Sequence, residues 1–156
     1  MNEFISAIHA VEETYGMFEF AIGHSLGGIS LLNAVKQGLN IKKLITIGAG
    51  NSINDICHLF VQNLELKPVV AEMMKHKFDT LFEEDIENYS SYIAAKDVTI
   101  PVLVIHDNDD IEIPVDAATN ICNELENGTT YITSHLGHRK ILGDANVINE
   151  IMDFLK

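Results

Sequence analysis

The spacing of hydrophobic residues along the chain predicts a regular alternation of strands and helices. Short runs of apolar and β-branched residues are typical of strands, whereas apolar positions repeated every three or four residues are typical of amphipathic helices. Four runs have the strand pattern: residues 18–23, 42–49, 99–106 and 129–134. Four segments have the helical pattern: residues 2–14, 26–39, 115–127 and 144–155. This order predicts an α/β protein with an open, mostly parallel sheet and flanking helices.

Residues 51–96 interrupt the alternation, because they contain no strand pattern. Three helical stretches fill the interval, at residues 53–64, 68–78 and 82–92. We therefore expect a helical lid insertion between the second and third strands. The chain has 156 residues, of which 47% are hydrophobic, and this is enough for one globular domain over residues 1–156.

A glycine-rich turn joins the first strand to the helix that follows it. The turn reads Gly23-His24-Ser25-Leu26-Gly27, which is a GxSxG pattern. In a nucleophile elbow the serine occupies a sharp strand-to-helix turn, so the residues two before and two after it must be small. Gly23 and Gly27 meet that need, and Ser25 would stand exposed at the helix N-terminus. The alternative is an ordinary turn in which the Ser25 side chain caps the helix.

Acidic residues and histidines follow the third and fourth predicted strands. The acidic residues are Asp107, Asp109 and Asp110, and the histidines are His135 and His138. Reactive groups of such sheets gather beyond the carboxyl ends of the strands, so we expect these side chains near Ser25. A serine, an acid and a histidine in this chain order fit a Ser-His-Asp catalytic triad.

Three segments together resemble the α/β-hydrolase family, and the resemblance covers essentially the whole chain. They are GHSLGG at residues 23–28, IPVLVIHDNDDIEIPV at residues 100–115 and LGHRKIL at residues 136–142. The resemblance implies that Ser25 is the nucleophile, Asp110 the acid and His138 the base. It also implies that the backbone N–H of Leu26 is one donor of the oxyanion hole.

The choice of acid and base rests on the positions within these motifs. If His106 and Pro114 are aligned with the histidine and proline of the family pattern, Asp110 falls on the acid position and Asp109 beside it. His138 is preferred over His135 because it follows a glycine and leads into the terminal helix. The competing interpretation is that these residues only form turns and helix entries.

Composition limits the partners and the location that we expect. The chain has 23 acidic and 10 basic residues and a net charge of −13, which disfavours nucleic acid and anionic membranes. An acidic N-terminal segment and the lack of a membrane-length apolar run predict a cytoplasmic protein. His58 and His76 have no second ligand at a metal-binding spacing, so we expect no metal and no cofactor. Cys57 and Cys122 are expected to be small buried residues.

The sequence departs from the family pattern before the elbow. Family members have several strands and an oxyanion loop there, whereas this sequence begins at the helix before the elbow strand, so the fold would be truncated. We expect weak activity if no second oxyanion donor is supplied. The strand from Phe18 to Gly23 would then be an exposed edge, and we expect a homodimer through antiparallel pairing of two such strands. The alternative is that the chain is a fragment of a longer protein.

The function that these features favour is a serine hydrolase acting on an ester or thioester of a small or acyl-chain substrate. An acyltransferase is the enzymatic rival, because the same triad can deliver the acyl group to an alcohol or thiol. A hypothesis of another class is a catalytically impaired hydrolase remnant that serves as an interaction module.

Overall fold

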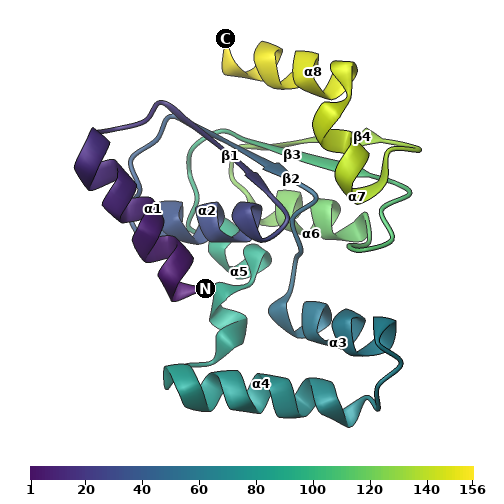
Figure 1. Cartoon of the computed structure of the whole chain (residues 1–156). Coiled ribbons are helices and arrows are strands. Elements are labelled where there is room, and N and C mark those ends of the chain that lie inside the picture. Colours follow the sequence, from purple (N-terminus) through teal and green to yellow (C-terminus); the bar gives the residue numbers. More distant parts are fainter.

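The computed structural model describes all residues, 1–156, and contains one parallel sheet of four strands in the order β1-β2-β3-β4 (Figure 1). The strands are β1 (Phe20–His24), β2 (Lys43–Ile47), β3 (Val102–Asp107) and β4 (Gly128–Thr133). The expected α/β fold class with a parallel sheet is therefore confirmed. β1 lies at one edge of the sheet and β4 at the other.

Two apolar layers cover the two faces of the sheet, since successive residues of a strand point to opposite faces. Leu44 of β2 and Val102 of β3 pack into the larger core, whereas Ile45 and Leu103 pack into the smaller one. Figure 1 shows α8 on one side of the sheet and α1, α2 and α6 on the other. These helices are α1 (Asn2–Tyr15), α2 (Leu26–Lys36), α6 (Asp116–Glu124), and α8 (Ala145–Leu155), which follows α7 (Gly137–Lys140) and η2 (Ile141–Gly143).

The segment between β2 and β3 is helical, and part of it lies away from the sheet (Figure 1). Its elements are α3 (Ile53–Asn63), α4 (Val69–Phe82), η1 (Ile86–Tyr89) and α5 (Ser91–Ala95). α3 and α4 enclose a small core of their own around Cys57, Val61 and Ala71. α5 instead packs beneath the sheet, where Ala94 and Ala95 belong to the larger core.

One predicted helix, at residues 82–92, is wrong. α4 continues to Phe82, and Glu83 then adopts a left-handed conformation with φ 54°, which ends the helix. The Asp79 carboxylate accepts a hydrogen bond from the Ile86 N–H, and the Asp85 carboxylate accepts one from the Glu87 N–H. These side-chain acceptors start a separate 3₁₀ turn, because they satisfy N–H groups that a continuous helix would pair internally.

In α8, Val147 is buried, whereas Ile148 next to it is 46% exposed. The burial predicted for the two cysteines is correct for only one of them. Cys57 is buried as expected, but Cys122 is only half-buried. Burial raises the pKa of both thiols, which keeps them protonated at neutral pH. None of the helices combines the length and the apolar composition that a membrane span requires.

Candidate active site

Ser25 occupies the sharp turn between β1 and α2. Its backbone has φ 52° and ψ −119°, a conformation that is strained for any residue other than glycine. The Ser25 N–H donates to the Ile47 carbonyl at 2.9 Å, and the Ser25 carbonyl accepts from the Gly28 N–H at 3.0 Å. Its side chain caps no N–H of the helix. The strained turn is thus held by the sheet on one side and the helix on the other, and the hydroxyl is not used as a cap.

The glycines that make this turn possible are Gly23 and Gly28. A Cβ atom at Gly23 would lie 2.5 Å from the Gly27 carbonyl, and one at Gly28 would lie 2.8 Å from the Cβ of Ala49. A Cβ at Gly27 would meet nothing within 4 Å. The expectation that Gly27 must be small is therefore wrong for this chain, because its α-carbon faces open space.

A buried carboxylate and a buried imidazole lie next to each other at the carboxyl end of the sheet. The Nδ1–H of His138 donates to Oδ2 of Asp110 at 2.7 Å, with side chains 6% and 1% exposed. The other oxygen, Oδ1, accepts from the N–H groups of Glu112 and Ile113, each at 2.9 Å. Because Nδ1 carries the proton in this bond, Nε2 of the neutral ring is left as the basic nitrogen.

The alternative residues, Asp109 and His135, form a second pair at the surface. Asp109 Oδ2 accepts from the His135 N–H at 2.6 Å and lies 3.1 Å from its Nδ1. Their side chains are 53% and 90% exposed. The structure thus joins Asp110 to His138 and Asp109 to His135.

Asp107 organises the loop that carries His138, a role that the sequence analysis missed. Its Oδ2 accepts from the Thr133 hydroxyl at 2.7 Å and from the Leu136 N–H at 3.2 Å. Its Oδ1 accepts from the N–H groups of Gly137 and Asp109, each at 2.9 Å. Burial alone would raise the pKa of Asp107, but these hydrogen bonds outweigh it and lower the pKa below its usual value.

Two further residues, His24 and Gly48, fix His138 beside the elbow. Nε2 of His24 donates to the backbone carbonyl of His138 at 2.9 Å, and the two ring centroids are 4.6 Å apart. A Cβ atom at Gly48, where φ is +58°, would lie 3.2 Å from the His138 ring. Since His24 precedes Ser25 directly, these contacts bring the imidazole next to the elbow. The Ser25 hydroxyl itself makes no hydrogen bond with His138, and such bonds often form only when substrate is present.

His106, in β3, contacts the loop that carries Asp110. Its ring is fully buried, Nε2 donates to the Ile113 carbonyl at 3.0 Å, and the same atom lies 3.4 Å from Asp110 Oδ2. The loop from Asp110 to Ile113 is therefore held at both ends. No three histidine, cysteine or acidic side chains lie together as a metal-binding group.

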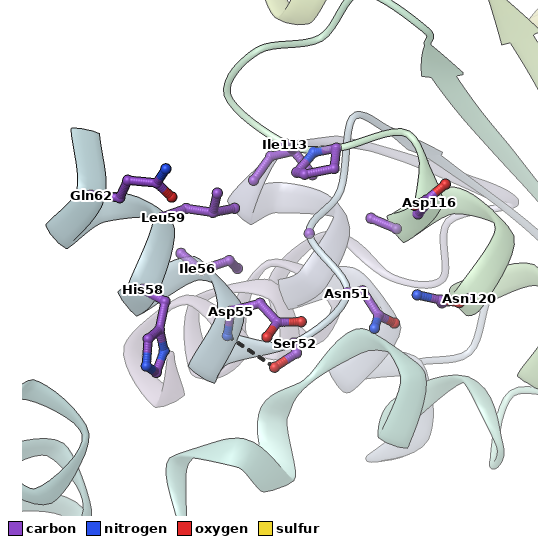
Figure 2. A pocket seen from close by; sticks show the side chains of 13 residues that line it. Asn51, Ser52, Asp55, Ile56, His58, Leu59, Gln62, Ile113, Asp116 and Asn120 are labelled. Atoms are coloured by element: carbon purple, nitrogen blue, oxygen red, sulfur yellow. Dashed lines mark hydrogen bonds between the residues drawn. The ribbon is translucent and has the colours of Figure 1, made fainter. Parts of the chain in front are cut away.

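Two grooves open near these residues. The first, of about 320 Å³, lies between α3 and the loop before α6, where Ile56 and Leu59 face Ile113, and Asn51 faces Asn120 (Figure 2). Neither Ser25 nor His138 lines it. The second, of about 390 Å³, runs along β1 to the elbow and is lined by Gly23, Leu26 and Gly27, with apolar side chains of α1.

Comparison with solved structures shows the fold of this chain. No protein-family model matches the sequence, and no curated protein matches it. Solved structures do match. An alpha/beta fold family hydrolase from Bacillus anthracis has 15% sequence identity and a TM-score of 0.71, and the match covers 99% of this chain and 73% of that one. A monoacylglycerol lipase from Paleococcus ferrophilus has 16% identity and a TM-score of 0.69, with 99% and 74% covered.

A third structure, the esterase domain of a Rhodothermus marinus protein, has 18% identity and a TM-score of 0.68, with 98% of this chain and 64% of that chain covered. Each match spans nearly all of this chain but only 64–74% of the other protein. The protein therefore has the alpha/beta-hydrolase fold. Its four strands and flanking helices correspond to part of the fold of these longer proteins.

Proposed function

We propose that the protein is a serine hydrolase that cleaves an ester or thioester, with Ser25 as nucleophile, His138 as base and Asp110 as acid. The observation that carries this proposal is the buried hydrogen bond from His138 to Asp110, in a loop that His24 links to the strained turn of Ser25. A structural role for Asp110 and His138 would not explain why the Ser25 hydroxyl is left out of helix capping. The esterase domain and the lipase among the similar structures support an ester as the bond.

The reaction follows from the positions of these groups. Nε2 of His138 takes the proton of the Ser25 hydroxyl as Oγ attacks the carbonyl carbon, and Asp110 stabilises the resulting imidazolium. The tetrahedral intermediate collapses, the leaving alcohol or thiol takes the proton from His138, and an acyl-serine remains. A water molecule then attacks the acyl-serine and gives a proton to His138, which passes it to Oγ of Ser25 as the acid is released.

Oxyanion stabilisation comes from the start of α2. The first helical hydrogen bond is donated by Gly28 to Ser25, so the N–H groups of Leu26 and Gly27 precede it and have no partner within the helix. We assign the Leu26 N–H as a donor to the oxyanion. Loss of one oxyanion donor typically lowers kcat by about 10²–10³. We therefore expect weak activity unless another group adds a second donor.

A serine-directed fluorophosphonate probe tests the proposal. We expect covalent labelling of the wild type, no labelling of Ser25→Ala, and labelling slowed about 10³-fold or more in His138→Ala. Ser134→Ala is the matched control, since Ser134 is exposed in the loop before His138 and should label as the wild type does. No labelling of a folded wild-type protein would contradict the proposal and favour an interaction module without catalytic function.

The acyltransferase alternative is separated by product analysis. With an activated ester as substrate, a hydrolase releases the free acid even when an alcohol or thiol is added. If the added alcohol or thiol takes most of the acyl group in competition with water, the transferase interpretation replaces the hydrolase one.

A further inference from the structure

The outer edge of β1 carries backbone groups that have no partner. On the inner edge, the Ser25 N–H donates to Ile47, and the Glu19 carbonyl accepts from Lys42 and Lys43. Successive residues of a strand direct their N–H and C=O groups to opposite edges. The groups of Phe20, Ile22 and His24 therefore point away from the sheet, towards the open side of β1.

Exposed apolar side chains surround this edge, and we call them the edge patch. They are Phe4, Val11, Phe18, Phe20, Ile22 and Leu26, each between 37% and 53% exposed. Two grooves run through the patch, and both are lined by residues of α1 and β1. One of them is lined by hydrophobic residues alone and has a volume of about 290 Å³. An apolar edge strand of this kind is a template for pairing with another strand.

We propose that a second copy of this chain binds the edge patch. The two β1 strands pair antiparallel, and the two-fold axis passes midway between the two Ile22 residues. In this register Ile22 lies opposite Ile22 of the other copy, and Phe20 lies opposite His24. These are the three residues whose backbone groups point outward, so they satisfy one another in about six hydrogen bonds. The outward groups are thus self-complementary, as a two-fold interface requires.

The size of the edge patch fits such an interface. If a fully exposed large apolar side chain presents roughly 200 Å², the six partly exposed side chains offer roughly 500 Å² in each copy. The pair would then bury about 1,000 Å² of apolar surface. A stable interface of standard size buries about 1,600 Å² in total, of which roughly 60% is apolar. The edge patch therefore supplies the apolar part of one standard dimer interface.

The same register extends the pairing to the elbow. Ile22 and His24, which pair with the second copy in this register, also line the groove beside the elbow. The second copy would then cover the groove that Gly23, Leu26 and Gly27 line. This step rests on the proposed function: the dimer covers the groove that leads to the oxyanion site.

Mass measurement of the whole protein tests the dimer without using activity. By light scattering after size exclusion, we expect the wild type to be a dimer at about 100 µM. Ile22→Lys places a charge at the centre of the interface and should give a monomer. Met152→Lys is the matched control, because Met152 is 56% and Ile22 51% exposed, and it should remain dimeric. A monomeric wild type, or an unchanged Ile22→Lys dimer, would overturn the proposal.

Cysteine cross-linking tests the register. In the proposed pairing the two Ile22 α-carbons lie about 5.5 Å apart, within the range for a disulfide. Ile22→Cys should therefore form a covalent dimer on mild oxidation. The two Phe20 α-carbons would be separated by about four residues along the strands, beyond disulfide range, so Phe20→Cys should not cross-link. Equal cross-linking of both variants, or none by Ile22→Cys, would refute this register. Both tests measure mass and not activity, so a negative result would refute the dimer without refuting Ser25 as the nucleophile.

Discussion

Asp107 ends β3 and Asp110 lies three positions later in the loop that follows, yet their carboxylates act on different groups. Asp107 binds only backbone N–H groups and one hydroxyl, and it fixes the path of the chain before His138. Asp110 divides its oxygens between two N–H groups of its own loop and the His138 ring. One carboxylate thus positions the backbone of the base, and the other orients its side chain.

Asp107 should make the stability of the protein depend on pH in the acid range. Its folded pKa lies below the unfolded value of about 3.9, so its contribution is complete above that pH and is lost as the pH falls through the folded pKa. We expect Asp107→Asn to lower the free energy of unfolding by about 3 kcal/mol at neutral pH, because buried N–H groups lose charged acceptors.

The comparison that checks this is urea denaturation at a series of pH values between neutral and about pH 2. The difference between wild type and Asp107→Asn should shrink as the pH falls. Asp109→Asn is the control, since the Asp109 side chain is 53% exposed and should cost little at any pH. A constant difference in unfolding free energy across the pH series would show that the charge of Asp107 does not stabilise the protein.

Gly48 should be needed for the His138 position rather than for the fold. In Gly48→Ala the new methyl group would lie 3.2 Å from the imidazole and the residue would keep φ near +58°, a left-handed value. We expect fluorophosphonate labelling to fall at least about tenfold, with a loss of stability of about 1–2 kcal/mol. Gly38→Ala is the control, because it has the same kind of positive-φ strain but no atom lies within 4 Å of its Cβ position. If both variants label alike, the contact with His138 does not matter.

At the scale of the elements, the elbow turn depends on how closely α2 approaches β1 and β2. We expect Gly28→Ala to destabilise the protein by about 1–3 kcal/mol and to abolish labelling, because its methyl group would lie 2.8 Å from Ala49 Cβ. Gly27→Ala, in the same helix, meets open space and should be neutral or slightly stabilising, since alanine favours helix. Thermal unfolding of the two variants distinguishes the effects. A larger loss of stability in Gly27→Ala than in Gly28→Ala would contradict this explanation.

The elements that the sequence predicts well are those whose pattern is set by burial. β2 and β3 are mostly apolar because both faces are covered, and α2 and α6 repeat their apolar residues towards the same core. The helix predicted at residues 82–92 fails because Asp79 and Asp85 capture backbone N–H groups locally. Apolar spacing carries no information about that competition.

The residues of the candidate site also fall into two groups: those that the sequence predicts and those that only the structural contacts reveal. Ser25, Asp110 and His138 are recognisable because each lies in a motif next to a strand end. Asp107 and Gly48 are not, because their importance arises from contacts with residues about 30 and 90 positions away. Gly27 is the opposite case. The GxSxG motif includes a glycine at this position, but a Cβ atom there would contact no neighbouring atom in this chain.

At the scale of the whole molecule, the net charge of −13 acts against the proposed dimer. Two such copies repel each other, and the repulsion reaches about 30 Å at 0.01 M salt but only about 3 Å at 1 M. The edge patch is held by apolar contacts and backbone hydrogen bonds, so screening removes repulsion without weakening an attractive ion pair. We therefore expect the dimer dissociation constant to fall about tenfold when sodium chloride rises from about 10 mM to about 500 mM.

Analytical ultracentrifugation at several salt concentrations measures this dependence. Glu13→Gln removes a charge from α1 near the edge patch, whereas Glu126→Gln removes one next to β4 at the opposite edge of the sheet. Glu13→Gln should tighten the dimer at low salt more than Glu126→Gln, and the two should converge at high salt because both charges are then screened. A dimer that weakens as salt is added would instead indicate an interface built on ion pairs, which the apolar edge of β1 does not offer.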